Sequence, residues 1–477
     1  MSHQTPHDCD PRAASAADTA PSGNQSHPRS VLIMSVLASS LAFIDGSIVT
    51  VALPAIRADL DASAAAIQWV VNAYFLPLAA LLLIGGALGD HYGRKTMLML
   101  GTALFGAASL LCALVPTLEA LIIGRAGQGI GGALLLPNSL ALLNGAFAGE
   151  ARGRAVGTWA AAGAIGGAVA PLAGGWIVEN YAWPAIFWLL VPLSIAAITI
   201  ALTRVDEVTS GDTNSIDWPG AATATIGLGG IALALTFWSE GGSITTNVVT
   251  AGIVGLGFLA FFLKIERAAG DHAMMPLGLF GGQCVVALNL LTFLLYGALG
   301  ALLLILPYLL IESGGYSETL AGLAIMPFPL IIGLGSPIMG GIAERIGARL
   351  PLTIGPLVVA GGLLLGMRIS EGSDYWTTVL PAIAVVGIGM ALAVAPLTSA
   401  VMAAVEERYT GTASGLNNAV SRTGNLIAVA LMGGVLSLTG SALFGGFHDA
   451  LLAMAAAAAL AGVVAWFGLS NLNIAKD

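Results

Sequence analysis

About fourteen apolar runs, each long enough to cross a lipid bilayer, occupy most of the 477-residue sequence. A membrane-spanning helix needs roughly 20 consecutive apolar residues. Only 9% of the residues are charged, against about a quarter in a typical soluble domain, so the charges are too few to cover a soluble particle of this size. The sequence therefore predicts an all-α polytopic membrane protein. The runs lie near residues 31–54, 68–89, 97–115, 120–144, 155–178, 185–203, 217–238, 247–265, 284–311, 319–343, 351–368, 379–402, 411–438 and 447–468.

The cations between the runs predict the orientation of the chain. If the N-terminus is cytoplasmic, ten of them face the cytoplasm, while Arg57 and Arg368 face outward. Such an excess is expected for cytoplasmic loops. We therefore expect both termini in the cytoplasm and a multi-pass protein of the inner (plasma) membrane. The ten cations are Arg94, Lys95, Arg152, Arg154, Arg204, Lys264, Arg267, Arg345, Arg349 and Arg408.

A short loop pattern occurs twice and indicates an internal repeat. GGALGDHYGRK, from Gly85 to Lys95, returns as GGIAERIGAR, from Gly340 to Arg349. Both copies fall on the same predicted side, which favours two parallel repeats. The plan is six helices, two extra helices and six more. Its parts are a disordered tail (1–30), an N-terminal bundle (31–204), a connecting segment with the extra pair (205–283), a C-terminal bundle (284–468) and a second tail (469–477).

Several function classes have no support in the sequence. A formal net charge of −9 argues against a nucleic-acid partner. No glycine-rich phosphate loop is present to bind a nucleotide. Three cysteines, at 9, 112 and 284, are expected to be unpaired, with no metal or other cofactor. No nucleophile, base and orienting acid gather at one membrane face, so an enzyme is not expected.

Four motifs in the first half resemble the fourteen-helix drug:proton antiporter branch of the major facilitator superfamily. They are FIDGSIVTVALP (Phe43–Pro54), the loop from Gly86 to Lys95, RAGQGIG (Arg125–Gly131), and Gly157 and Gly166 followed by APLAGG (Ala170–Gly175). Together they form a specific signature, although each one is weak by itself. Thr50, His91 and Ala170 depart from the residues that are common in the branch.

Asp45 is the only acidic residue that we place well inside a run. A carboxylate in the bilayer is unfavourable unless it is protonated, paired or facing water, and such residues often mark transport sites. We therefore expect Asp45 to take up a proton or to contact substrate at a central cavity. The alternative is a structural acceptor that fixes the first helix against a neighbour.

Arg125 is the second charge inside a run of the first half, and Gln128 follows it by three positions on the same helical face. The resemblance implies that Arg125 faces the cavity and helps to couple proton movement to substrate release. Because a guanidinium does not give up its proton, it would act on the acid or on water. Snorkelling of Arg125 to the outer interface is the alternative.

The loop after the second run is a candidate gate. Asp90, Arg94 and Lys95 are able to pair with one another or with the next cytoplasmic loop. The resemblance implies that this cluster closes one conformation and opens in another, whereas the alternative is a set of cations that only orient the chain. The expected gating residues are Gly86, Asp90, Gly93, Arg94, Lys95, Glu150, Arg152 and Arg154.

Glycines crowd the fifth run around Pro171. They allow close helix contact, and proline removes a backbone donor, so we expect a kinked and tightly packed hinge. The resemblance implies a seam between the two bundles that limits leak. General packing of small residues is the alternative. The motif residues are Gly157, Gly166, Pro171, Gly174 and Gly175.

Two sets of polar residues are expected to line a substrate cavity, with helix packing as the alternative. The second run offers Trp69, Asn72 and Tyr74, and the thirteenth offers Asn417, Asn418 and Arg422 at helical spacing. The second half has no obvious acid inside a run, so a dicationic substrate is not expected.

We predict a proton-coupled secondary active exporter of hydrophobic or amphipathic small molecules, with protons, substrate and the lipid bilayer as its partners and a monomer as its working form. A transporter of one specific natural solute or lipid is the alternative. A membrane receptor or scaffold without transport is a weaker one, because it has no need of Asp45 and Arg125.

Overall fold

A computed structural model describes residues 27–115, 117–207, 217–270, 273, 275, 277–405 and 410–469. Within these ranges the chain is helical with no β-strand, and thirteen helices are long and apolar enough to cross a membrane. The expected all-helical membrane fold is thus confirmed. The two expected tails lie almost entirely outside the described residues, and the first helix begins at Pro28.

The first group of helices follows the six expected runs. The expected run 185–203 forms two helices that meet at Leu189 and together make one candidate span. The helices are α1 (Pro28–Asp59), α2 (Ala64–Tyr92), α3 (Arg94–Leu114), α4 (Leu118–Ala146), α5 (Gly149–Asn180), α6 (Ala185–Trp188) and α7 (Leu190–Arg204).

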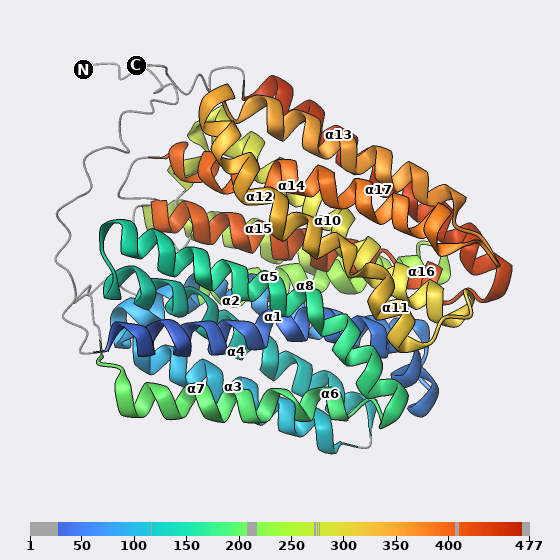
Figure 1. The fold of residues 1–477 in the computed structure, drawn as a ribbon, viewed down its shortest axis with the longest axis horizontal. Helices are drawn as coiled ribbons and strands as arrows, with labels where there is room; N and C mark the ends of the chain where they lie inside the picture. The colour runs from blue at the N-terminus through green and yellow to red at the C-terminus, as the bar shows by residue number, and fades with distance from the viewer. Residues whose placement is uncertain are drawn as a thin grey trace.

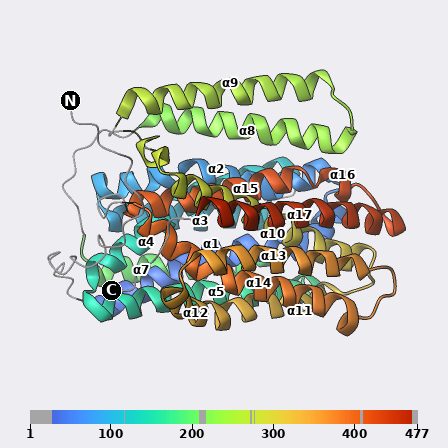
Figure 2. The ribbon, with the colours of Figure 1, turned by 90° about the horizontal axis from the view of Figure 1, so that it is seen from above.

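The extra pair forms a hairpin at one edge of the bundle (Figure 2). It consists of α8 (Trp218–Gly241) and α9 (Thr246–Ala269). α8 packs on α2 and on the later helix α15 (Thr410–Ala430), while α9 packs on α8. Ile253 and Leu256 of α9 are 66% and 64% exposed, as suits a helix whose outer face meets lipid.

The last group carries the remaining helices. Short η3 (Leu277–Gly281), η4 (Gly366–Arg368) and η5 (Tyr375–Val379) join or extend them. The helices are α10 (Gln283–Glu312), α11 (Glu318–Ile325), α12 (Pro327–Ile346), α13 (Arg349–Leu365), α14 (Leu380–Ala403), α15, α16 (Gly433–Leu436) and α17 (Gly440–Gly468). Figure 1 shows α3, α4, α6 and α7 on one side of the molecule and α12, α13, α14 and α17 on the other.

The expected run 411–438 is the one that does not appear among the thirteen candidate spans. It forms α15 and the short α16, with a turn at residues 431–432 between them. Polar side chains such as Asn417, Asn418 and Arg422 lower the hydropathy of α15.

Two pairs of glycines support the internal repeat. A Cβ on Gly101 of α3 would lie 2.8 Å from the carbonyl oxygen of Gly131 of α4, and one on Gly131 would lie 2.7 Å from that of Gly101. Gly355 of α13 and Gly389 of α14 face each other in the same way, at 2.8 and 2.6 Å. The third and fourth long helices of both groups therefore meet backbone to backbone, which only glycine permits.

The repeated loops also share a backbone conformation. Gly93 and Gly347 end α2 and α12 with φ of 104° and 85°, a region that disfavours side chains. Both loops lie at the same end of the bundle (Figure 1). We call this the loop end, and the opposite end the far end.

Candidate functional site

A buried ion pair joins α1 to α4 in the first group. Nη1 of Arg125 lies 2.7 Å from Oδ1 and 2.6 Å from Oδ2 of Asp45. Asp45 is 0% exposed and Arg125 is 1% exposed. Opposite charges at such a depth are tolerated when they pair and their remaining hydrogen bonds are satisfied. The two charges that the sequence places inside the first bundle therefore compensate each other.

Gln128 connects the ion pair to α3. Its side-chain oxygen accepts a hydrogen bond from Nη1 of Arg125 at 2.7 Å, and its amide donates to Oδ1 of Asp45 at 3.2 Å. The amide also donates to the hydroxyl of Ser109 at 2.9 Å. Ser109 was missed in the sequence, because a helical serine commonly bonds its own backbone, as Ser109 does at the carbonyl of Phe105.

α2 holds the other side of Arg125. Nε donates to the carbonyl of Val70 at 2.9 Å, and the guanidinium carbon lies 4.6 Å from the ring centroid of Tyr74. The Tyr74 hydroxyl donates to the carbonyl of Ala42 on α1 at 3.1 Å. Cation–π contacts of a desolvated arginine are worth about 2 kcal/mol. The Arg125 side chain therefore has partners on α1, on α2 and on its own helix, α4.

This network sets what the site can do chemically. The Asp45 carboxylate accepts hydrogen bonds from Arg125 and Gln128 and is not exposed to solvent. A proton reaches such a carboxylate only when the surrounding helices let water in, and neutralising it leaves the Arg125 charge without its partner. Protonation of Asp45 would therefore require a rearrangement of the surrounding helices.

Glu207 caps the loop end of α3. Its carboxylate accepts hydrogen bonds from the backbone N–H groups of Lys95 and Thr96 at 2.9 and 3.0 Å. A carboxylate at the first N–H groups of a helix stabilises that end. The sequence analysis missed Glu207, which lies 112 positions from Lys95.

The expected gating loop carries an ion pair of its own. Arg94 lies 2.9 Å from Asp90, one turn earlier, and Nζ of Lys95 donates to the carbonyl of Val205 at 2.6 Å. A Cβ on Gly86 would lie 3.6 Å from Pro137 of α4. The Lys95 hydrogen bond attaches the loop to the end of α7.

The next loop holds the other expected gating residues. Arg152 donates to the carbonyl of Phe147 at 3.0 Å, and Arg154 lies on the exposed first turns of α5. The Glu150 side chain lies outside the described part of the chain.

The α5 glycines differ along the helix. A Cβ on Gly157 would meet nothing within 4 Å, and one on Gly166 would lie 3.4 Å from Ile44. Towards the far end, a Cβ on Gly174 would lie 2.4 Å from Ile48, and one on Gly175 would lie 2.1 Å from the carbonyl oxygen of Glu318 on α11. The close contact between the two groups is therefore made at the far end.

At the far end, α15 stops at Ala430, and other helices donate hydrogen bonds to the carbonyls around this point. Carbonyls near a helix break lose the N–H four residues ahead as a partner, although the Val429 carbonyl still accepts from the N–H of Met432 at 3.0 Å. The carbonyls of Val429 and Ala430 accept hydrogen bonds from Gln68 of α2 and, at 3.1 Å, from Ser239 of α8. Arg57 of α1 donates to the carbonyl of Leu436 at 2.8 Å and to the hydroxyl of Tyr308 on α10.

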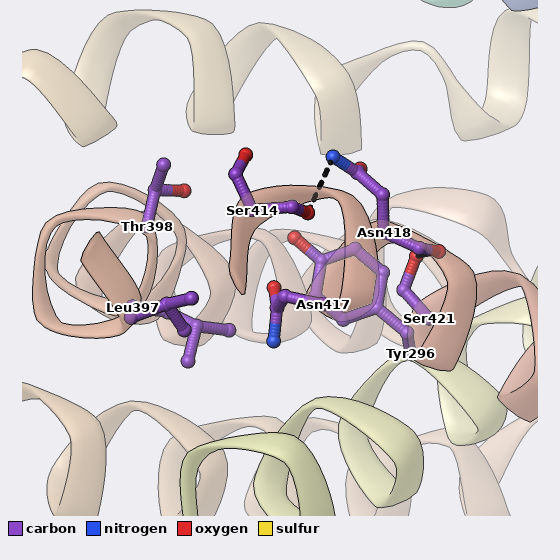
Figure 3. A pocket seen from close by; sticks show the side chains of 8 residues that line it. Tyr296, Leu397, Thr398, Ser414, Asn417, Asn418 and Ser421 are labelled. Carbon is purple, nitrogen blue, oxygen red and sulfur yellow. Dashed lines mark hydrogen bonds between the residues drawn. The ribbon is translucent and has the colours of Figure 1, made fainter. Parts of the chain in front are cut away.

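Polar residues of α15 line a small cavity of about 80 Å³ against α10 and α14. Asn417 donates to Thr292 at 2.7 Å and Asn418 to the carbonyl of Ser414 at 3.2 Å. Figure 3 shows Thr398, Ser414 and Asn418 projecting towards the same side. Sites for drug-sized ligands measure about 300–1,000 Å³, so such a ligand requires the helices to separate further. The cavity is lined by Tyr296, Leu397, Thr398, Val401, Ser414, Asn417, Asn418 and Ser421.

The other expected cavity residues occupy different places. Tyr74 belongs to the ion-pair network, and Trp69 is half-buried on α2. Asn72 is fully buried, and both of its amide atoms lack a hydrogen-bond partner. Arg422 is half-buried on α15.

The sequence model of the Major Facilitator Superfamily matches residues 35–286 and 288–475. The chain belongs to this superfamily. It is a transporter, since members of the superfamily carry small molecules across membranes.

Several relatives of this transporter carry the names of resistance proteins. The "Methylenomycin A resistance protein" of Bacillus subtilis (strain 168) is 32% identical over 447 residues, which cover 93% of this chain and 95% of the relative. The "Multidrug resistance protein Stp" of Mycobacterium tuberculosis (strain CDC 1551 / Oshkosh) is 31% identical over 409 residues, covering 85% of this chain and 75% of the relative. These similarities identify a transporter related to drug-efflux proteins.

Solved structures show the same fold. The crystal structure of the peptide transporter POT in complex with sulfate superposes with a TM-score of 0.69 and 15% identity, covering 98% of this chain and 100% of that chain. The likeness concerns the fold of the transporter and not its substrate.

Proposed function

We propose that the transporter is a proton-coupled exporter that exchanges protons for hydrophobic or amphipathic small molecules. The buried network of Asp45, Arg125 and Gln128 carries this proposal. Among the described acidic residues, Asp45 alone lies near the middle of a long helix, where carboxylates serve transport more often than structure. The names of the two relatives support efflux as the direction.

In the proposed cycle, Asp45 alternates between two forms. Paired with Arg125 it is ionised, and once protonated it releases Arg125 to new partners. Gln128 contacts both residues and keeps them in register while the pair opens. Because the two forms favour different helix arrangements, proton binding shifts the equilibrium between conformations.

The contacts at the two ends support alternating access. The far end is closed by Gly175 against Glu318 and by Arg57 on Leu436. Towards the loop end, Gly157 of α5 and Gly341 of α12 have nothing within 4 Å of an added Cβ. We assign this conformation to a state closed on the outside, with the substrate cavity at Trp69, Asn72, Tyr74, Asn417, Asn418 and Arg422.

The membrane arrangement belongs to the same proposal. We count α15 with α16 as the thirteenth of fourteen crossings, so both termini would lie on one side of the membrane. The loop cations favour the cytoplasm as that side, and we propose a monomer in the inner membrane. The loop residues Asp90, Arg94 and Lys95 would then gate the cytoplasmic side together with Glu150, Arg152 and Arg154. The α5 residues from Gly157 to Gly175 would seal the seam between the bundles.

A susceptibility panel tests the proposal. The full chain is expressed in a bacterial host that lacks its own efflux pumps, and growth is measured against antibiotics and dyes of different charge and polarity. We expect higher tolerance to several amphipathic compounds, and loss of that tolerance with a protonophore or with Asp45→Asn. Protection that survives the protonophore would reject proton coupling, and protection against no compound would reject efflux of such molecules.

A further inference from the structure

Arg422 is a helical cation that has no ion-pair or hydrogen-bond partner among the described residues. It lies in the middle of α15, half-buried, on the polar face that also carries Asn418 one turn earlier. Over the described ranges of the chain, no carboxylate lies within ion-pair distance of its guanidinium, and no hydrogen bond from it is formed. An arginine inside a membrane helix normally finds an anion, a carbonyl or water.

The surroundings place Arg422 at the junction of the two bundles. Its helix α15 packs against α10 of its own bundle and against α2 of the other bundle. The small cavity is lined by Tyr296, Asn418 and Ser421, and Ser421 directly precedes Arg422 in the chain. Figure 3 shows the Tyr296 ring beside the side chains of Asn417 and Ser421. Arg422 thus lies one helical turn after Asn418, at the edge of this cavity.

The charges near this cavity do not cancel. Asp45 and Arg125 neutralise each other, and the Tyr74 ring lies against the Arg125 guanidinium. The remaining groups around the cavity are amides, hydroxyls and apolar side chains. Among the described residues, one positive charge is therefore left over, in a place where poor solvation strengthens its attraction for an anion.

We infer that this cavity, once the helices separate further, recognises amphipathic molecules that carry a carboxylate, which binds to the guanidinium of Arg422. This inference rests on the proposed transport function and names its substrate class. The planar guanidinium matches a carboxylate with two parallel N–H···O bonds. The Asn418 amide donates one N–H to Ser414 and has a second N–H to donate beside it. Leu397 and Val401 supply apolar contacts for the rest of the molecule.

Binding of a matched pair of probes tests the inference. Naphthaleneacetate and naphthaleneacetamide have the same shape but differ in charge. Their affinities are measured by calorimetry near neutral pH with the full chain in nanodiscs of phosphatidylcholine, which carries no net charge, and empty nanodiscs correct for partitioning. We expect the acid to bind at least ~10-fold more tightly than the amide.

Substitutions assign the preference to Arg422. Arg422→Gln is expected to abolish it, and Arg422→Lys to keep part of it, because an ammonium retains the charge without the planar fork. Lys264→Gln removes the same charge from an exposed position on α9 and should leave the preference unchanged.

Each outcome bears on the inference alone. Equal binding of acid and amide, no saturable binding of the acid, or a preference that survives in Arg422→Gln would overturn it. A loss of preference in Lys264→Gln as well would show that bulk charge is responsible and would also overturn it. Because binding is measured without a proton gradient, these results are independent of proton-coupled export, which the protonophore arm of the susceptibility panel tests.

Discussion

Gly175 of α5 and Gly322 of α11 bring the backbones of the two bundles into contact at the far end. A Cβ on Gly175 would lie 2.1 Å from the carbonyl oxygen of Glu318, and a Cβ on Gly322 would lie 2.3 Å from that of Pro171. Both obstacles are backbone atoms, so neither can move aside as a flexible side chain does. The far end closes in this way only with glycine at both positions.

Gly175→Ala and Gly322→Ala should therefore oppose closure of the far end. Inserting a methyl group into such a contact costs about 1–3 kcal/mol, which shifts the population towards states open at this end. Spin labels at Tyr181 and Trp376, both 71% exposed, report the separation of the bundles by pulsed electron resonance. We expect longer distances in both variants.

Gly157→Ala is the matched control on the same helix, because its added methyl group meets nothing within 4 Å. It should keep the wild-type distances at the far end. Wild-type distances in Gly175→Ala would contradict the proposed closure.

Arg57→Gln should loosen the far end by a different route. Arg57 donates to the carbonyl of Leu436 and to the Tyr308 hydroxyl, and hydrogen bonds from a charged group are worth about 1.5–3 kcal/mol. The same spin-label distances should lengthen. Arg368→Gln, which removes an exposed charge at the same end, should have no such effect, and an equal effect of both substitutions would argue for a general charge effect.

Much of the fold was readable from the sequence, because long apolar runs and loop cations constrain a membrane protein strongly. The spacing of Arg125 and Gln128 also predicted a shared face, and the structure brings both to Asp45. Their roles in coupling stay predictions. The break after Ala430 was not foreseen, although Gly433 and Gly434 follow it, because these glycines lie inside a long apolar run and the side chains that bond the nearby carbonyls come from other helices.

Contacts between distant segments were not predictable from the sequence. Ser109 and Glu207 belong to common residue types, and only the packing of α3 against α4 and α7 gives them their partners. Gly322 has no recognisable motif around it, and its importance follows from the position of Pro171 on another helix. Such contacts depend on helix rotation and depth, which local patterns do not record.

Glu207→Ala should destabilise the folded transporter modestly. It removes the acceptor for the backbone N–H groups of Lys95 and Thr96, and loss of a helix cap costs about 1 kcal/mol. We expect a lower midpoint of thermal unfolding in a thiol-reactive dye assay. Glu207→Gln keeps one acceptor oxygen and should lie between wild type and Glu207→Ala, while an unchanged midpoint in Glu207→Ala would show that the cap does not contribute.

The most direct test concerns Asp45 in proteoliposomes that contain a pH-sensitive dye. A substrate from the susceptibility panel is loaded inside, and its outward gradient is used to drive proton entry. The wild type should acidify the lumen, while Asp45→Asn, which cannot gain or lose a proton at this position, should show no substrate-driven acidification. Substrate movement that continues without protons would assign Asp45 to coupling alone, and its loss would assign it to both steps. Full acidification by Asp45→Asn would contradict the account.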